Sequence, residues 1–221
     1  MVYSIQQKVL SEFLGTFALV FCGTGAIVIN SVSNGAVSHV GVAITFGLVV
    51  TAMIYAFGKV SGAHINPAVT LAFWLNKSFD QSLVLPYVLS QLSGAVAASV
   101  VLRLLFPEAI TLGETLPSGS NLQSFILEMI LSFILMLVIF QTAAGSKETA
   151  LAGLIIGFVV LFEAMFAGPI CGASMNPARS LGPAIVSGNI QSLWVYLIAT
   201  TMGMSLAVPI YRILRAPANS N

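Results

Sequence analysis

The sequence predicts an all-α membrane protein in which six transmembrane helices and two re-entrant half-helices form an inverted repeat. Three observations predict this fold class. Hydrophobic residues make up 57% of the 221-residue chain and charged residues only 7%, whereas soluble domains carry roughly 25% charged residues. The chain also contains six apolar runs near the ~20 residues that a helix needs to cross a bilayer. Finally, the tripeptide Asn-Pro-Ala occurs twice, once in each half of the chain, at Asn66 and at Asn176.

Six of the apolar runs are long enough to span a membrane, and two more are too short. At a rise of ~1.5 Å per residue, each short run forms a helix of about 14–15 Å, half of the ~30 Å hydrocarbon core. The short runs, Pro67–Leu75 and Pro177–Val186, are therefore expected to enter the membrane without crossing it. The predicted spans are Val9–Val32, Val37–Phe57, Leu83–Phe106, Leu122–Ala143, Ala150–Ala167 and Leu193–Leu214.

The basic residues lie almost entirely on one side of this topology. If the spans alternate in direction, the other side receives only Arg103. The positive-inside rule then places both termini in the cytoplasm and makes the second half-helix enter from outside. The short tails favour a prokaryotic source, and hence the cell (inner) membrane. The residues on the cytoplasmic side are Lys8, Lys59, Lys77, Lys147, Arg212 and Arg215.

The two halves of the chain repeat one pattern within a single transmembrane domain, residues 1–221. Each half, about 1–110 and 120–221, holds three spans and one half-helix, and each places one glutamate early in an apolar span, Glu12 and Glu128. Because three is odd, the second half must lie upside down relative to the first. Inverted repeats that meet at the midplane are typical of transport proteins. Asn66 and Asn176 are then expected to meet near the membrane centre.

The Asn-Pro-Ala copies have the chemistry of helix starts. Proline is favoured at the first helical position, and asparagine is a strong N-cap whose oxygen accepts from the first turn. A plain cap would explain one copy, but "GAHINPAVT" and "GASMNPARS" share flanks and mirror-related positions. With its oxygen used, each Asn has only N–H donors left. Two such amides on one narrow path would orient a passing water and block proton hopping, and two positive helix ends would repel cations.

These motifs resemble the aquaporin, or major intrinsic protein, family over nearly the whole chain. The segment "FAGPICGASMNPARSLGPA" is very similar to nodulin-26-like members. The resemblance implies the aquaporin fold and passive conduction of water and small neutral solutes without a cofactor. It also implies a homotetramer in membrane lipid, with one pore per subunit. The pore motif residues are Asn66, Pro67, Ala68, Asn176, Pro177 and Ala178.

The resemblance also places Phe46, Ala164, Ala173 and Arg179 in one selectivity filter. Arg179 lies in the first turn of the second half-helix, where the helix dipole disfavours a cation. A charge inside a membrane segment is costly and usually functional. The first motif has Val69 in the corresponding place. Strictly water-selective relatives tend to have His at the Ala164 position, and glycerol-selective ones two aromatics, so this ring is expected to be wider than a strict water filter.

Four polar residues are expected to support the loops or line the pore. Glu12 and Glu128 are expected to accept hydrogen bonds from backbone N–H groups of the two non-spanning loops, with a proton relay as the alternative. Gln91, in the third span, is expected to help to hold a loop. His64 either lines the cytoplasmic half of the pore or is structural.

Glu163 and the two cysteines leave alternatives open. Glu163 is next to the filter position Ala164, where similar sequences often carry Asn. It is a candidate to pair with Arg179, to support the extracellular loop or to face a subunit contact. Cys22 and Cys171 lie in apolar surroundings, which favours two free thiols over a disulfide.

A passive channel is the leading functional hypothesis. The alternatives are a facilitator mainly for glycerol or metalloid hydroxides such as arsenous or boric acid, an ion- or proton-coupled secondary transporter, and a structural junction protein. No nucleophile–base set or metal cluster appears, so an enzyme is not expected. The net charge of +1 offers no nucleic-acid-binding patch.

Overall fold

The structure is a computed structural model that describes residues 3–144 and 148–215. The short helices are α3 (Pro67–Leu75) and α7 (Pro177–Ser187), and a 3-10 turn, η1, covers Glu148–Leu151. Six further helices are long and apolar enough to cross a membrane, which confirms the predicted all-α membrane class. They are α1 (Ile5–Val32), α2 (Ser38–Ser61), α4 (Gln81–Leu105), α5 (Asn121–Ala144), α6 (Ala152–Cys171) and α8 (Leu193–Leu214).

The helix ends differ from the predicted ones by at most four residues, about one turn, and polar or glycine caps explain the largest differences. Helix α1 begins earlier because Ser4 and Gln7 form a capping box, in which each side chain bonds the other's backbone N–H. Helices α2 and α6 each continue one turn beyond the apolar run. They end at Gly62 and Gly172, which adopt left-handed conformations with φ of 90° and 85°.

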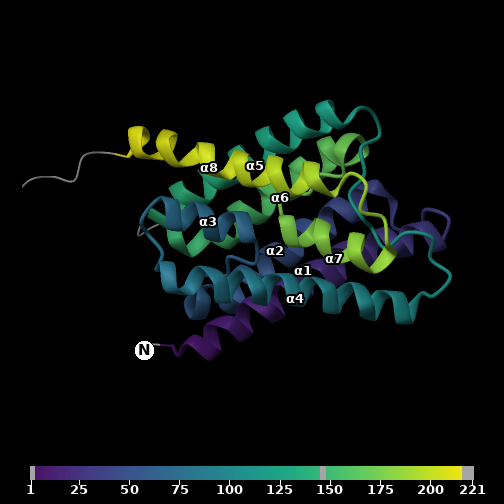
Figure 1. Ribbon diagram of the computed structural model, residues 1–221, viewed down its shortest axis with the longest axis horizontal. Coiled ribbons are helices and arrows are strands. Elements are labelled where there is room, and N and C mark those ends of the chain that lie inside the picture. The colour runs from purple at the N-terminus through teal and green to yellow at the C-terminus, as the bar shows by residue number, and fades with distance from the viewer. Residues whose placement is uncertain (1–2, 145–147, 216–221) are drawn as a thin grey trace, which may run out of the picture.

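The long helices form a bundle around the two short ones (Figure 1). Helix α1 packs against α2 and α4, and α5 packs against α6 and α8. Contacts between α2 and α6 join the two halves. The short helices α3 and α7 both pack against α4 and α8. Figure 1 shows them between α4 and α8, reaching toward opposite ends of the molecule.

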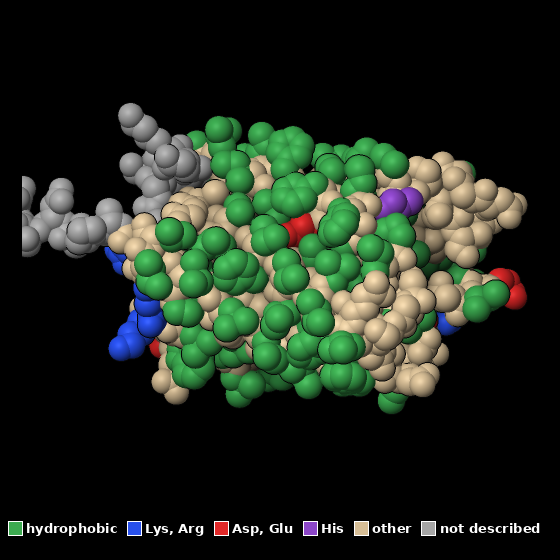
Figure 2. Space-filling model, turned by 90° about the horizontal axis from the view of Figure 1, so that it is seen from above, with side chains coloured by type: hydrophobic (Ala, Val, Ile, Leu, Met, Phe, Trp, Pro, Cys, Tyr) green, Lys and Arg blue, Asp and Glu red, His purple; other side chains and the backbone are tan. Residues whose placement is uncertain are grey.

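On the face shown in Figure 2, hydrophobic side chains cover most of the middle of the bundle, where one acidic side chain is visible between them, and the basic side chains lie at the two ends. At one end Arg212 donates to the carbonyl of Leu75 (2.7 Å) and so joins α8 to the last turn of α3. Asp80 caps α4 there, and the N–H of Ser82 holds the pKa of its carboxyl below its usual value. We call this end, which carries Lys8, Lys59, Lys77 and Arg212, the basic end. Lys147 lies outside the described residues.

The two halves repeat the same local geometry. Asn66 (φ −160°, ψ 119°) and Asn176 (φ −152°, ψ 112°) precede α3 and α7 in matching conformations. The loops before them match as well: positive φ occurs at Ala63 and Ala173 (47° and 43°) and at Ile65 and Met175 (43° and 53°). Each of these pairs has the same separation in sequence as the two asparagines, which we call the motif offset. The segment 46–70 therefore corresponds, position by position, to the segment 156–180.

A second correspondence relates α4 to α8. A Cβ atom placed on Gly94 would meet the carbonyl oxygen of Phe13 on α1, and one on Gly203 would meet that of Met129 on α5. Both glycines therefore allow a long helix to cross its neighbour closely. When Gly94 is aligned with Gly203, each position of α8 is paired with one of α4.

Candidate pore and its supporting residues

Each half-helix begins at an asparagine that caps it. The Oδ1 atom of Asn66 accepts from the N–H of Ala68 at 2.9 Å. The same atom of Asn176 accepts from Ala178 at 3.0 Å and Arg179 at 3.4 Å. Proline follows each asparagine at the first helical position, where its missing N–H leaves nothing unpaired. Both amide groups therefore have only N–H donors left to offer.

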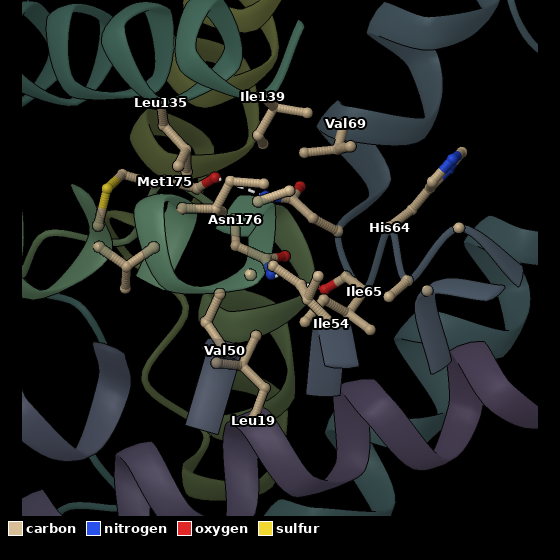
Figure 3. Close-up of a pocket in the computed structure, with 18 of the residues that line it drawn as sticks. Leu19, Val50, Ile54, His64, Ile65, Val69, Leu135, Ile139, Met175 and Asn176 are labelled. Atoms are coloured by element: carbon tan, nitrogen blue, oxygen red, sulfur yellow. Dashed lines mark hydrogen bonds between the residues drawn. The ribbon is translucent and has the colours of Figure 1, made fainter. Parts of the chain in front are cut away.

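The two asparagines also hold the opposite loop. Nδ2 of Asn66 donates to the carbonyl of Met175 at 2.8 Å, and Nδ2 of Asn176 donates to the carbonyl of Ile65 at 2.9 Å. Figure 3 shows Asn176 between Met175 and Ile65. An amide NH₂ group carries two hydrogens, so one N–H of each asparagine remains for another acceptor. The reciprocal bonds place the starts of α3 and α7 side by side.

Glu12 holds the loop before α3 by accepting four hydrogen bonds. Two come from the backbone N–H groups of His64 (2.9 Å) and Ile65 (2.6 Å), the latter in a left-handed conformation. Two come from side chains, the hydroxyl of Ser61 and the amide of Gln91, both at 2.7 Å. A β-branched residue at positive φ is strained. The buried carboxylate compensates by satisfying the N–H groups that this conformation turns inward.

Glu128 does the same for the loop before α7. It is fully buried and accepts from the N–H groups of Ser174 (2.7 Å) and Met175 (2.9 Å). Backbone at membrane depth needs such partners because the hydrocarbon offers none. Both glutamates thus have the hydrogen bonds expected of loop supports.

Gln91 and His64 join the support of the first loop. Nε2 of Gln91, which donates to Glu12, is also 3.0 Å from Oγ1 of Thr70. The His64 ring lies 3.1 Å from the same hydroxyl oxygen and stacks on Phe73, with ring centroids 4.8 Å apart. His64 also lines the central cavity. His64 therefore lines the cavity and also packs within the first loop, and its role in a pore stays a prediction.

The four residues of the expected filter lie together. Phe46, Ala164, Ala173 and Arg179 are all buried and line one cavity. The guanidinium carbon of Arg179 is 4.9 Å from the centroid of the Phe46 ring, within cation–π range. Its Nη1 donates to the carbonyl of Gly113 at 2.6 Å. Arg179 is held in place from two sides, with its charge beside the cavity.

Glu163 does not pair with Arg179. Its side chain is 1% exposed, and neither carboxylate oxygen has a hydrogen-bond partner among the described residues. Because Glu163 is the neighbour of Ala164 on α6, its side chain leaves the helix in a different direction from the cavity-lining position. It does not line that cavity. Both cysteines are free, Cys22 exposed and Cys171 buried.

The sequence did not reveal the contribution of the segment before α5. Gly113 has a φ of 74°, and a Cβ there would lie 2.9 Å from Thr24, so the position suits only glycine. Its carbonyl oxygen accepts the hydrogen bond from the guanidinium of Arg179. Thr115 donates to the hydroxyl of Ser180 on α7 at 2.7 Å. The only sequence signal is an isolated glycine between two spans, "TLGETL", which does not reveal a long-range partner.

The two asparagines, His64 and the four residues of the expected filter line one cavity of about 490 Å³. Arg179 lines it on one side of the asparagines, and Lys59 and Tyr55 line it toward the basic end. Asn66 and Asn176 both lie in its wall. Most of the other lining side chains are aliphatic, and several of them surround Asn176 in Figure 3. The cavity is largely apolar, and its wall also holds the paired amides and the arginine.

Comparison with known proteins assigns this architecture. Residues 2–211 match the profile of the family described as Major intrinsic protein. The chain is 46% identical to Aquaporin NIP1-1 of Zea mays over 211 residues, 95% of this chain and 75% of that protein. It is 42% identical to Nodulin-26 of Glycine max, covering 95% and 78% of the two chains. The X-ray structure of the aquaglyceroporin from Plasmodium falciparum superposes with a TM-score of 0.85 at 28% identity, over 94% and 96% of the chains.

Proposed function

Because the chain belongs to the major intrinsic protein family, we propose that it is a passive channel for water and small neutral solutes in which the paired Asn-Pro-Ala motifs form the central station. The observation that carries this proposal is the pair of amides, Asn66 and Asn176, in the wall of one cavity. Each keeps an N–H that is free to donate to the oxygen of a passing water. The water's hydrogens then point away from the centre in both directions, which interrupts proton hopping.

The filter is the second part of the proposal. Phe46, Ala164, Ala173 and Arg179 form the ring that every solute passes on the side away from the basic end. Arg179 repels cations and donates hydrogen bonds, while the two alanines leave space for solutes larger than water. Glycerol and metalloid hydroxides such as arsenous and boric acid are the candidates that this width favours. The likeness to an aquaglyceroporin supports the wider solute range.

The chain is an integral, multi-pass membrane protein, and its placement and assembly complete the proposal. The basic end faces the cytoplasm with both termini, in the cell (inner) membrane, because Lys and Arg are retained on that side. Four copies assemble as a homotetramer, with one pore per subunit. Labelling of single cysteines introduced at either end of the bundle in sealed cells tests the orientation, and the mass of the solubilised protein tests the tetramer.

A coupled secondary transporter is the competing class, and flux measurements separate the two. Coupled transport needs an acid that binds and releases protons along the path. Glu12 and Glu128 instead accept bonds from loop N–H groups. We expect flux through purified protein in vesicles to be unchanged by an imposed pH gradient or by ionophores. Flux that follows the pH gradient would favour the transporter.

The test of the filter is stopped-flow permeability of proteoliposomes to water and to glycerol. Wild type is expected to pass both. Ala164→His should reduce glycerol permeability about tenfold, since it narrows the ring by a full side chain, and should reduce water permeability much less. Phe166→His is the matched control, because Phe166 lies on the same helix but is 65% exposed. If wild type passes water alone and Ala164→His changes nothing, the wide filter is wrong.

A further inference from the structure

The repeat predicts a second ring of pore residues in the other half of the molecule. The loops and caps around the two Asn-Pro-Ala motifs match at the motif offset. The glycines at which α2 and α6 cross match at the same offset. A Cβ on Gly47 would meet the Gly157 carbonyl, and one on Gly157 would meet the Gly47 carbonyl. Every filter position therefore has an equivalent on the basic-end side of the asparagines.

The four equivalents line the same cavity as the filter and are all apolar. Val69 occupies the place of Arg179 in the first turn of its half-helix, and Ile54 occupies the place of Ala164 on its long helix. In Figure 3, Ile54 and Val69 lie toward the His64 side of Asn176. The complete correspondence is Phe46 with Ile156, Ala164 with Ile54, Ala173 with Ala63, and Arg179 with Val69.

The two rings differ in chemistry as well as in place. The filter has one charged donor and a small residue at Ala164. The equivalent ring has no side-chain donor or acceptor, and isoleucine replaces that alanine. Val69 and Ile156 are 4% and 9% exposed, so both are held in place by their neighbours. A solute at this ring must shed hydrogen bonds that the side chains do not replace, and a hydrophobic constriction opposes wetting.

We propose that Ile54, Ile156 and Val69, with Ala63, form a second selective ring that sets the size limit for larger neutral solutes. This inference rests on the proposed channel function. The ring acts by bulk and by lack of hydrogen bonding, whereas the Arg179 ring acts by charge and by donors. Passage of a polyol is therefore limited on the basic-end side of the asparagines, and water, which is smaller, is affected less.

The test is Ile54→Ala, with paired glycerol and water permeabilities in proteoliposomes. Removal of the isoleucine methyl and methylene groups is expected to raise glycerol permeability about tenfold, the lower end of what one methylene group is worth to discrimination in an apolar site. Water permeability should rise less. Ile44→Ala is the matched control, because Ile44 lies on the same helix, is 39% exposed and does not line the cavity. Ile54→Val, a milder change, and Ile156→Ala give the same reading if Ile54→Ala folds poorly.

The outcomes separate the ring from the channel itself. A higher glycerol-to-water ratio in Ile54→Ala and Ile156→Ala, with an unchanged ratio in Ile44→Ala, supports the second ring. A conducting wild type whose ratio is the same in all these variants overturns the second ring and leaves the channel intact. A wild type that passes neither water nor glycerol overturns the proposed function itself.

Discussion

The two half-helices begin with nearly identical backbone geometry, yet the side chains around them do different work. In the first half a dense hydrogen-bonded group, in which Glu12 accepts four bonds, surrounds the loop before α3. In the second half the most distinctive polar residue is Arg179, which lines the cavity and donates to the carbonyl of Gly113. The repeat thus supplies two equivalent scaffolds. Both loops are held by a buried glutamate, but only the second half places a charged side chain in the cavity wall next to its asparagine.

The difference is clearest around the two glutamates. Ser61 and Gln91 donate to Glu12, and their equivalents beside Glu128 are Cys171 and Thr200. A thiol is a weak donor, and the Thr200 hydroxyl donates to the carbonyl of Tyr196 instead. Glu128 therefore depends mainly on the two loop N–H groups. Each loop is thus supported by its own glutamate, and Glu12 accepts more hydrogen bonds than Glu128 does.

The largest expected effect comes from removing the two carboxylates. Glu12→Leu leaves two backbone N–H groups and two side-chain donors without their acceptor, and Glu128→Leu leaves two backbone N–H groups. At about 1–3 kcal/mol for each stranded buried group, Glu12→Leu should cost several kcal/mol and more than Glu128→Leu. Glu→Gln keeps an acceptor and should cost less at both sites. Thermal unfolding and the yield of monodisperse protein measure this. Equal losses in the Leu and Gln variants would contradict the support role.

The sequence predicted most of the architecture because its strongest signals are local. Apolar runs and charges marked the spans, and Asn-Pro marked the starts of α3 and α7 to the residue. The remaining errors lie at helix ends such as Ile5, where a polar capping box extends the helix beyond the apolar run. Hydropathy carries no information about such a turn.

The candidate site was less predictable, because its remaining parts depend on long-range contacts. The pairing of each asparagine with the opposite loop joins residues that are 109 and 111 positions apart. Arg179 donates to the carbonyl of Gly113, a contact that no sequence motif predicts. Glu163 was a candidate to pair with Arg179, but proximity in sequence to Ala164 does not determine the direction of a side chain on a helix.

The second prediction concerns Arg179, the position at which the second half differs most from the first. Arg179→Val introduces the side chain that Val69 has in the equivalent place, and removes the charge at the filter. Loss of ~1.4 kcal/mol of electrostatic repulsion corresponds to roughly tenfold more cation or proton leak. A pH-sensitive dye inside proteoliposomes reports the leak. Val186→Ala, on the same half-helix but outside the cavity lining, serves as the control for altered packing. No change in leak in Arg179→Val would mean that the helix dipoles and the asparagines suffice for exclusion.

The third prediction concerns the support of the Phe46 ring. A Cβ on Gly23 of α1 would overlap that ring, so Gly23→Ala must displace either the ring or the helix. Overpacking of this kind costs typically ~1–3 kcal/mol, and a ring displaced into the cavity should lower glycerol permeability more than water permeability. Gly41→Ala, at a site outside the cavity lining, is the control. A Gly23→Ala channel with wild-type stability and glycerol-to-water ratio would show that Phe46 is not held by α1.

The smallest expected effect compares two equivalent tyrosines. Tyr87 on α4 donates its hydroxyl to the carbonyl of Ser61 at 2.8 Å. Tyr196 on α8 corresponds to it when Gly94 and Gly203 are aligned, and its buried hydroxyl has no hydrogen-bond partner within the described part of the chain. Loss of one satisfied bond costs about 1 kcal/mol and strands a buried carbonyl, whereas loss of an unpaired hydroxyl removes only a desolvation cost. Tyr87→Phe should therefore lower the thermal stability, while Tyr196→Phe should leave it unchanged or raise it. Each variant is the other's control, because the chemical change is the same. Equal losses in both would mean that the Tyr196 hydroxyl is bonded in the membrane, and that the two halves are supported more alike than their side chains indicate.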